Sequence, residues 1–169
     1  MATRVIVLAA DYFEESELIY PVIRLRDEGY DVVVAGLGTG PVRGKSGYGP
    51  YPVDADVADI DAATVDAVVV PGGFAPDLLR RSPAVLDLVR TVDAAGKPVA
   101  FVCHGGWVAV SAGIIRGRRM TGVSAIRDDL VNAGAQWLDE PLVVDGNLIS
   151  VQLPRDLGPW TRAIVTALS

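Results

Sequence analysis

Four runs of apolar residues in the first two thirds of the chain predict buried β-strands. They occupy residues 5–10, 31–36, 66–70 and 99–102, and Val, Ile and Ala make up most of each run. Short apolar runs bounded by turn residues are typical of parallel strands that are covered on both faces. The pattern therefore predicts a mostly parallel sheet buried between two layers of helices.

The segments between these runs have the spacing of helices. Residues 14–28 carry apolar side chains at helical intervals and acidic side chains in the first turn. Ser82 followed by Pro83 marks the start of a helix that extends to about residue 95, and a short helix is expected at 76–81. This alternation predicts right-handed crossovers, with the loops at the carboxyl ends of the strands meeting at one crevice.

Beyond residue 117 the predicted elements become shorter. They are a brief strand at 119–123, a helix at 127–133, a hairpin at 142–150 that turns at an Asp-Gly pair, and a helix at 154–168. Residues 37–64 are rich in Gly, Pro, Tyr and Asp, which indicates either a plain connection at one sheet edge or a surface for self-association. No repeat or linker interrupts the chain, so we expect one domain over residues 1–169.

Composition excludes several classes of function. The 169 residues carry a net charge of −6 and half of them are hydrophobic, without the basic patch of a nucleic-acid-binding protein. One Cys and one His exclude a disulfide framework and a zinc site built from soft ligands, so no metal and no cofactor are expected. No apolar run approaches the length of a membrane span, and no signal-peptide layout is present. These features predict a cytoplasmic protein.

The single cysteine lies at the end of the fourth apolar run. Cys103 and His104 follow this strand, Gly105 and Gly106 permit a sharp turn, and the next residues predict a helix that ends at Gly113. Hydrolases present a nucleophile on such a strand–turn–helix elbow, where the helix N-terminus favours a thiolate. The alternative is an inert, buried cysteine at a strand end.

Four further residues are candidates for chemistry beside the thiol. His104 either acts on the sulfur or contributes only its backbone N–H, and Asp77 either orients the imidazole or is a surface acid at the start of a helix. Glu17 is placed at the same rim, where burial would keep it protonated as a hydrogen-bond donor to a thiolate, although most such acids are solvated. The N–H groups of Gly73 and His104 are candidates for an oxyanion hole, or Gly73 only makes a turn.

The sequence resembles the ThiJ/PfpI superfamily, within the class I glutamine-amidotransferase-like fold. The matching segments are FEESELIYP (13–21), VPGGFAPD (70–77), AFVCHG (100–105), DDLVNAG (128–134) and VVDGN (143–147). The resemblance implies a flavodoxin-like three-layer α/β/α sandwich with a nucleophile elbow. It is greatest to the PfpI branch, whose members are described as intracellular proteases, protein deglycases and glutathione-independent glyoxalases.

Carried over by position, the resemblance implies that Cys103 is the nucleophile and Glu17 its protonated hydrogen-bond partner. Gly73 and His104 match the oxyanion donors. In this branch the acid at the position of Asp77 comes from a neighbouring subunit, which implies a homo-oligomer, a dimer or a trimer of dimers. Two departures from the branch pattern are Gly106-Trp107, where Pro usually follows Cys-His-Gly, and Gln152, where Arg is usual.

The leading hypothesis is a cysteine-dependent enzyme that acts on small reactive carbonyls, on their protein adducts or on peptides. The alternative is a non-enzymatic sensor in which Cys103 is oxidised by peroxide, since a low-pKa thiol beside an acid also suits that role. A third hypothesis is an inactive relative, because of the departures at Gly106, Trp107 and Gln152.

Overall fold

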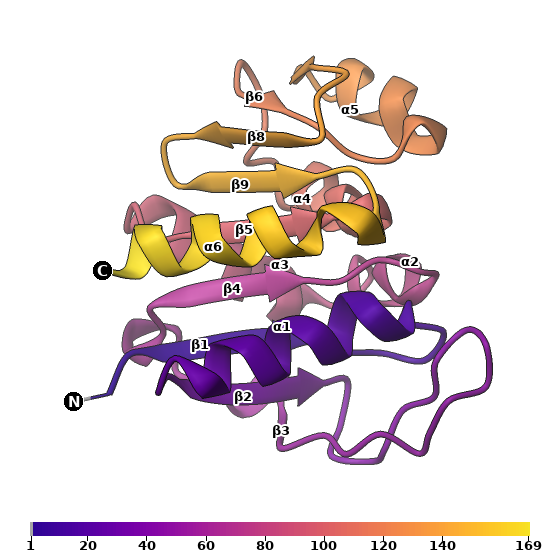
Figure 1. Cartoon of the computed structure of the whole chain (residues 1–169), viewed down its shortest axis with the longest axis vertical. Helices are drawn as coiled ribbons and strands as arrows, with labels where there is room; N and C mark the ends of the chain where they lie inside the picture. The colour runs from indigo at the N-terminus through magenta and orange to yellow at the C-terminus, as the bar shows by residue number, and fades with distance from the viewer. Residues whose placement is uncertain (1) are drawn as a thin grey trace.

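The structure is a computed structural model that describes residues 2–169. Within this range one seven-stranded sheet has the order β3-β2-β1-β4-β5-β9-β8, and only β8 runs antiparallel to its neighbour (Figure 1). The strands of this sheet are β1 (Arg4–Leu8), β2 (Asp31–Gly36), β3 (Ala55–Asp56), β4 (Ala67–Val70), β5 (Val99–Val102), β8 (Leu142–Asp145) and β9 (Leu148–Val151). The strands β6 (Arg119–Met120) and β7 (Gln136–Trp137) pair separately.

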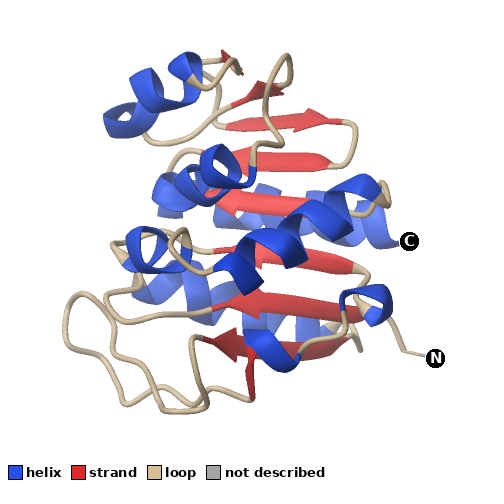
Figure 2. Ribbon diagram, turned by 180° about the vertical axis from the view of Figure 1, so that it is seen from behind, coloured by secondary structure: helices blue, strands red, loops and turns tan. Residues whose placement is uncertain are grey.

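Helices cover both faces of the sheet. They are α1 (Glu15–Asp27), α2 (Ala75–Leu79), α3 (Pro83–Ala94), α4 (Gly106–Ala112), α5 (Arg127–Asn132) and α6 (Leu157–Leu168). The helices α1 and α6 lie side by side on one face, and α3 and α4 pack together on the other (Figures 1 and 2). The predicted three-layer α/β/α arrangement is confirmed. None of the helices within residues 2–169 is long and apolar enough to cross a membrane.

The central strands are buried because both of their faces meet helices. Every residue of β4 and β5 is buried, and so is every residue of β1 after Arg4. The predicted helix signals also hold: the Ser82 hydroxyl accepts a hydrogen bond from the Val85 N–H at 3.4 Å, and Gly113 ends α4 with φ of 75°. Apolar runs and end signals thus agree on the same elements.

The structure differs from the predicted elements mainly in its short pieces. The strand expected over 119–123 covers two residues and pairs in parallel with β7, which the sequence does not predict, because two residues show no periodicity. The last helix begins at Leu157 rather than at 154, because a single 3-10 turn, Pro154–Asp156, precedes it. Residues 37–64 contain the short strand β3 and two 3-10 turns.

The loops that follow β1, β4 and β5 lie next to one another because these three strands are adjacent in the sheet. The loop after β1 is joined to the loop after β4: the Phe74 N–H donates to the Tyr12 carbonyl at 2.8 Å. The long segment between β2 and β3, residues 37–54, is called the excursion after β2. Phe13 pairs with Gly44 of this excursion, which brings it to the same carboxyl ends of the strands. These loops at the carboxyl ends of the strands form the predicted crevice.

Candidate active site

A cavity of about 260 Å³ lies at the carboxyl ends of the central strands. Its lining residues are Glu14, Glu17, Lys45, Gly73, Phe74, Cys103, His104, Leu153 and Pro154. The structure thus brings together Cys103, His104, Glu17 and Gly73, four of the five residues expected from the sequence. The fifth, Asp77, does not line this cavity.

Cys103 lies between β5 and α4 in a left-handed backbone conformation, with φ of 57°. A side chain in this region costs about 1 to 3 kcal/mol, and such strain is concentrated at functional sites. The turn is possible because Gly105 has no Cβ, which would overlap the Val70 carbonyl oxygen. The predicted elbow is therefore a sharp turn with Cys103 in the left-handed region, and the glycine at position 105 makes room for it.

Glu17 is fully buried on α1, with an exposed fraction of 0%. The Gly72 N–H donates to Glu17 Oε2 at 2.7 Å, while Oε1 has no partner among the described residues. Burial, with a further effect of the Glu14 charge, raises the pKa of Glu17 to about 7. A protonated carboxyl therefore has an O–H to offer beside Cys103.

The Cys103 thiol differs from the thiolate expected at an elbow. Burial, together with the charge of ionised Glu17, raises its pKa to about 12, although the His104 N–H and Lys45 act in the opposite direction. The loss of hydration around the sulfur outweighs the effect of the short helix α4. Burial and an ionised Glu17 therefore both oppose the thiolate, while a protonated Glu17 would not add to this effect.

His104 supplies a base within reach. Its Nδ1 lies 3.3 Å from Cys103 Sγ, so the two adjacent side chains meet rather than point apart. Burial and the Lys45 charge lower the pKa of the imidazole, so the ring is neutral at pH 7. A neutral imidazole has one nitrogen that can accept a proton, and the 3.3 Å contact places Nδ1 beside the sulfur.

The glycine pair after β4 is required for two different reasons. Gly73 has φ of 76°, and a Cβ there would overlap the Tyr12 carbonyl oxygen. The Gly73 N–H has no acceptor among residues 2–169 and lines the cavity, as an oxyanion donor should. Gly72 was not expected: a Cβ there would overlap Glu17 Oε2 and lie 2.9 Å from Cys103 Cβ.

Asp77 lies on α2, which ends at Leu79 rather than at the expected residue 81, and it pairs at 2.5 Å with Arg81 in the turn that follows the helix. Its side chain is 43% exposed and has no hydrogen bond or ion pair with His104 within the described residues. A role in orienting His104 therefore requires the Asp77 of another subunit, as the family resemblance implies.

Lys45 was not expected from the sequence. It comes from the excursion after β2, and its backbone N–H donates to the Phe13 carbonyl at 2.8 Å. Its positive charge favours the ionised forms of Glu17 and Cys103 and the neutral form of His104. A lone lysine in a turn-rich segment has no sequence pattern that marks it as a site residue.

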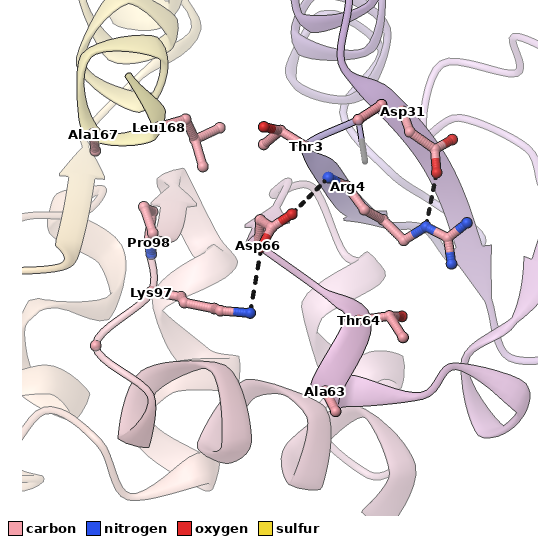
Figure 3. Close-up of a pocket in the computed structure, with 12 residues that line it drawn as sticks. Thr3, Arg4, Asp31, Ala63, Thr64, Asp66, Lys97, Pro98, Ala167 and Leu168 are labelled. Carbon is pink, nitrogen blue, oxygen red and sulfur yellow. Dashed lines mark hydrogen bonds and ion pairs between the residues drawn. The ribbon is translucent and has the colours of Figure 1, made fainter.

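A larger cavity, of about 960 Å³, lies at the opposite ends of the central strands, next to their first residues and the end of α6 (Figure 3). Its charged groups are paired: Arg4 with Asp31 at 2.7 Å, and Lys97 with Asp66 at 3.3 Å. Neither the cysteine nor the histidine lines it. Among residues 2–169, no three His, Cys, Asp or Glu side chains gather as ligands for a metal ion.

The sequence profile of the DJ-1/PfpI family matches residues 3–167. The chain belongs to the DJ-1/PfpI family. Deglycase PfpI of Pyrococcus furiosus is 41% identical over 165 residues, which are 98% of this chain and 99% of that protein. The protein/nucleic acid deglycase 2 of Escherichia coli is 35% identical over 170 residues, 99% of each chain.

Solved structures show the same family fold. DJ-1beta of Drosophila melanogaster superposes with a TM-score of 0.93 at 30% identity, covering 99% of this chain and 91% of that one. A two-domain protein of Anabaena variabilis, with DJ-1/ThiJ/PfpI-like and ferritin-like domains, superposes with a TM-score of 0.95 at 41% identity. The match covers 98% of this chain and 48% of the Anabaena chain.

The departures from the DJ-1/PfpI pattern lie beside the cavity rather than in its wall. Trp107 packs edge-on against the His104 ring, with 5.1 Å between centroids, and its Nε1–H donates to Asp129 at 2.8 Å. A Cβ on Gly106 would come within 3.1 Å of the side chains of Ile126 and Leu130, so glycine suits this packing. Gln152 donates to Asp139 at 2.9 Å, outside the lining.

Proposed function

We propose that this DJ-1/PfpI protein is a cysteine-dependent enzyme that acts on small reactive carbonyls or their protein adducts, as a glyoxalase or deglycase, with peptides as a further substrate class. The observation that carries the proposal is the contact of 3.3 Å between Cys103 Sγ and His104 Nδ1 above the buried Glu17 carboxyl. Relatives over nearly the whole chain are named deglycases, at 41% to 44% identity.

The chemistry follows from the positions of the protons. His104 Nδ1 takes the Cys103 proton as the sulfur adds to an aldehyde carbon, which gives a hemithioacetal. The N–H groups of Gly73 and His104 stabilise the oxygen that gains charge. With methylglyoxal, a proton moves from the first carbon to the second, and water then hydrolyses the resulting thioester to lactate and free thiol. The sum is methylglyoxal plus water to lactate plus a proton.

The contact between Cys103 and His104 favours an enzyme over a peroxide sensor. Peroxide reacts with the thiolate, whose formation is opposed by burial of Cys103. An enzyme can overcome this with a base, and His104 Nδ1 lies 3.3 Å from the sulfur. A sensor would instead show peroxide-dependent mass gain on Cys103 without turnover of any carbonyl.

The proposal includes an assembly and a location. We infer that Asp77 of a neighbouring subunit completes the site, in a dimer or a trimer of dimers, because within its own chain Asp77 pairs with Arg81 instead. A reducing compartment keeps a lone thiol free, so we place the reaction in the cytoplasm.

A panel of substrates tests the proposal. Purified protein is given methylglyoxal, glyoxal, a methylglyoxal adduct of N-acetyl-lysine, and a fluorogenic peptide, each with Cys103→Ala as the control. We expect turnover of at least one carbonyl substrate, lost in the variant. Activity on all substrates that is unchanged in Cys103→Ala would refute the proposal, and peptide cleavage alone would move the assignment to a peptidase.

A further inference from the structure

The excursion after β2 holds one lysine at the wall of the active-site cavity. The Lys45 N–H is bonded to Phe13, and the next residue, Ser46, donates its N–H to Glu15 Oε1 at 2.7 Å. The excursion packs so closely on α1 that a Cβ on Gly44 would overlap the Glu15 side chain. Lys45 is therefore held at the cavity by its backbone, while its side chain is exposed.

The Lys45 ammonium has no ion-pair partner among residues 2–169. The acid beside it in the wall, Glu14, is engaged elsewhere: its Oε2 accepts from the Glu17 N–H at 2.9 Å and from the Ser16 hydroxyl. This carboxylate caps the N-terminus of α1, where the helix dipole compensates a negative charge. The ammonium is left free to act on a ligand.

The other groups of the wall add no competing cation. His104 is neutral, and Phe74, Leu153 and Pro154 are apolar. The cavity therefore combines one lysine, a Gly73 N–H without an acceptor among residues 2–169, apolar surface around the thiol, and the carboxyl groups of Glu14 and Glu17. Glu14 is compensated by the helix dipole, and burial raises the pKa of Glu17 to about 7, so Glu17 carries only part of a negative charge at neutral pH. This combination suits a small anion whose reactive or newly formed carbon faces Cys103.

We propose that Lys45 is the anion-binding residue of this site, and that it takes the carboxylate of a small 2-hydroxy acid product or of a substrate that carries a carboxylate beside its carbonyl. The identity of the anion rests on the proposed function, whereas the preference for a negative charge beside Cys103 does not. Lys45 sets specificity, and removing its charge weakens anionic ligands while neutral ones are unaffected.

Two alkylating reagents of equal size and different charge test this preference. Iodoacetate and iodoacetamide are reacted with Cys103 at pH 8, and the ratio of their rate constants is measured by mass spectrometry. A change in thiol pKa alters both rates alike, so the ratio reports only the charge of the reagent. Loss of an ammonium–carboxylate pair at a partly exposed site should lower the ratio about fivefold in Lys45→Met.

Arg43 provides the matched control. It lies two residues away in the same excursion, its side chain does not line the cavity, and Arg43→Met removes the same charge. We expect the ratio to be unchanged in Arg43→Met and retained in Lys45→Arg. An unchanged ratio in Lys45→Met, or an equal fall in Arg43→Met, would overturn the proposal.

The single histidine provides a second measurement that does not depend on alkylation. The chain has one His, so His104 gives the only imidazole signals in its proton NMR spectrum. Glycolate should shift these signals saturably in the wild type and fail to do so in Lys45→Met, and neutral glycolamide should shift neither. No shift in the wild type would refute the proposal. If none of the carbonyl substrates is turned over but the charge preference is present, the proposed function fails and the anion site stands.

Discussion

The side chains of Cys103 and Glu17 show that burial can agree with one expectation drawn from the sequence and oppose another: Glu17 has the raised pKa that was expected, whereas the thiolate expected at Cys103 is disfavoured. Both pKa values rise because both groups lose hydration, Glu17 to about 7 and Cys103 to about 12. Each group, when ionised, opposes ionisation of the other. Near neutral pH at least one of them therefore keeps its proton.

The raised pKa of Glu17 makes stability depend on pH. The folded carboxyl, at about 7 against 4.5, holds its proton more tightly than the unfolded one, so its favourable contribution is full below pH 4.5 and is lost as pH rises to 7. Relative to Glu17→Gln, the wild type should lose up to about 3 kcal/mol of unfolding free energy between pH 4.5 and 7.5. Urea unfolding of both proteins at the two pH values measures this.

Glu15 is the control for this experiment. Its partial burial acts to raise its pKa, but the N–H groups of Ser46, of Glu15 itself and of Tyr48, with Lys45, lower it overall. Its contribution is therefore present above pH 4.5 and lost on acidification, so Glu15→Gln should cost stability at pH 7.5 and not in acid. The same sign for both variants would show that the pKa of Glu17 is not raised.

A site residue could be predicted from the sequence when it lies next to a recognisable strand end or helix start. Glu17 and Cys103 were recognisable because a strand end or helix start fixed their place at the rim. The extent to which Glu17 and Cys103 are buried could not be predicted, because the loop after β4 that covers them is distant in sequence from Glu17 and Cys103. Lys45 lies in a segment without periodicity, and the pairing of Asp77 with Arg81 could have been predicted from their spacing of four on a helix.

The loop after β4 is the element that sets the distance between α1 and the elbow. Its Gly72 lies between Glu17 and Cys103 and donates the N–H that holds the Glu17 carboxyl. The loop therefore acts as a spacer with no side chain of its own at that point. The Pro-Gly-Gly pattern predicted a turn, but it did not reveal which glycine faces the reacting groups.

A methyl group at position 72 should separate Glu17 from Cys103. In Gly72→Ala the new Cβ would overlap Glu17 Oε2, so we expect a loss of about 1 to 3 kcal/mol of stability and a large fall in carbonyl turnover. Urea unfolding and turnover are compared with Gly40→Ala, where a Cβ has no neighbour within 4 Å. Wild-type activity in Gly72→Ala would contradict the spacer role.

Long elements were predictable and short ones were not. The range 31–36, predicted from its apolar run, is the range of β2, whereas β3, β6 and β7 have two residues each. Such strands form because tertiary contacts bring their backbones together. The local sequence pattern does not contain this information. The DJ-1/PfpI resemblance supplied the sandwich as a whole, and superposition on the family's solved structures agrees.

At the scale of the whole molecule, the proposed site draws on two copies of the chain. If Asp77 acts across an interface, co-refolded Cys103→Ala and Asp77→Asn subunits should recover activity that neither variant has alone. In a dimer about a quarter of the wild-type sites would be complete. Turnover by the mixture, with the oligomeric state from light scattering, measures this.

The control mixture pairs Cys103→Ala with Glu17→Gln. Glu17 and Cys103 meet within one chain, so this mixture should stay inactive at every ratio. Recovery in the control, or none in the Asp77 mixture despite a confirmed oligomer, would remove Asp77 from the site.

The central claim is that Cys103 performs repeated catalysis on a reactive carbonyl. The most direct measurement is the number of lactate molecules formed per subunit from excess methylglyoxal, in the wild type and in Cys103→Ala. We expect many lactate molecules per wild-type subunit and none above background in the variant. Consumption that stops near one methylglyoxal per subunit, without lactate, would show a thiol that is only modified and would contradict the claim.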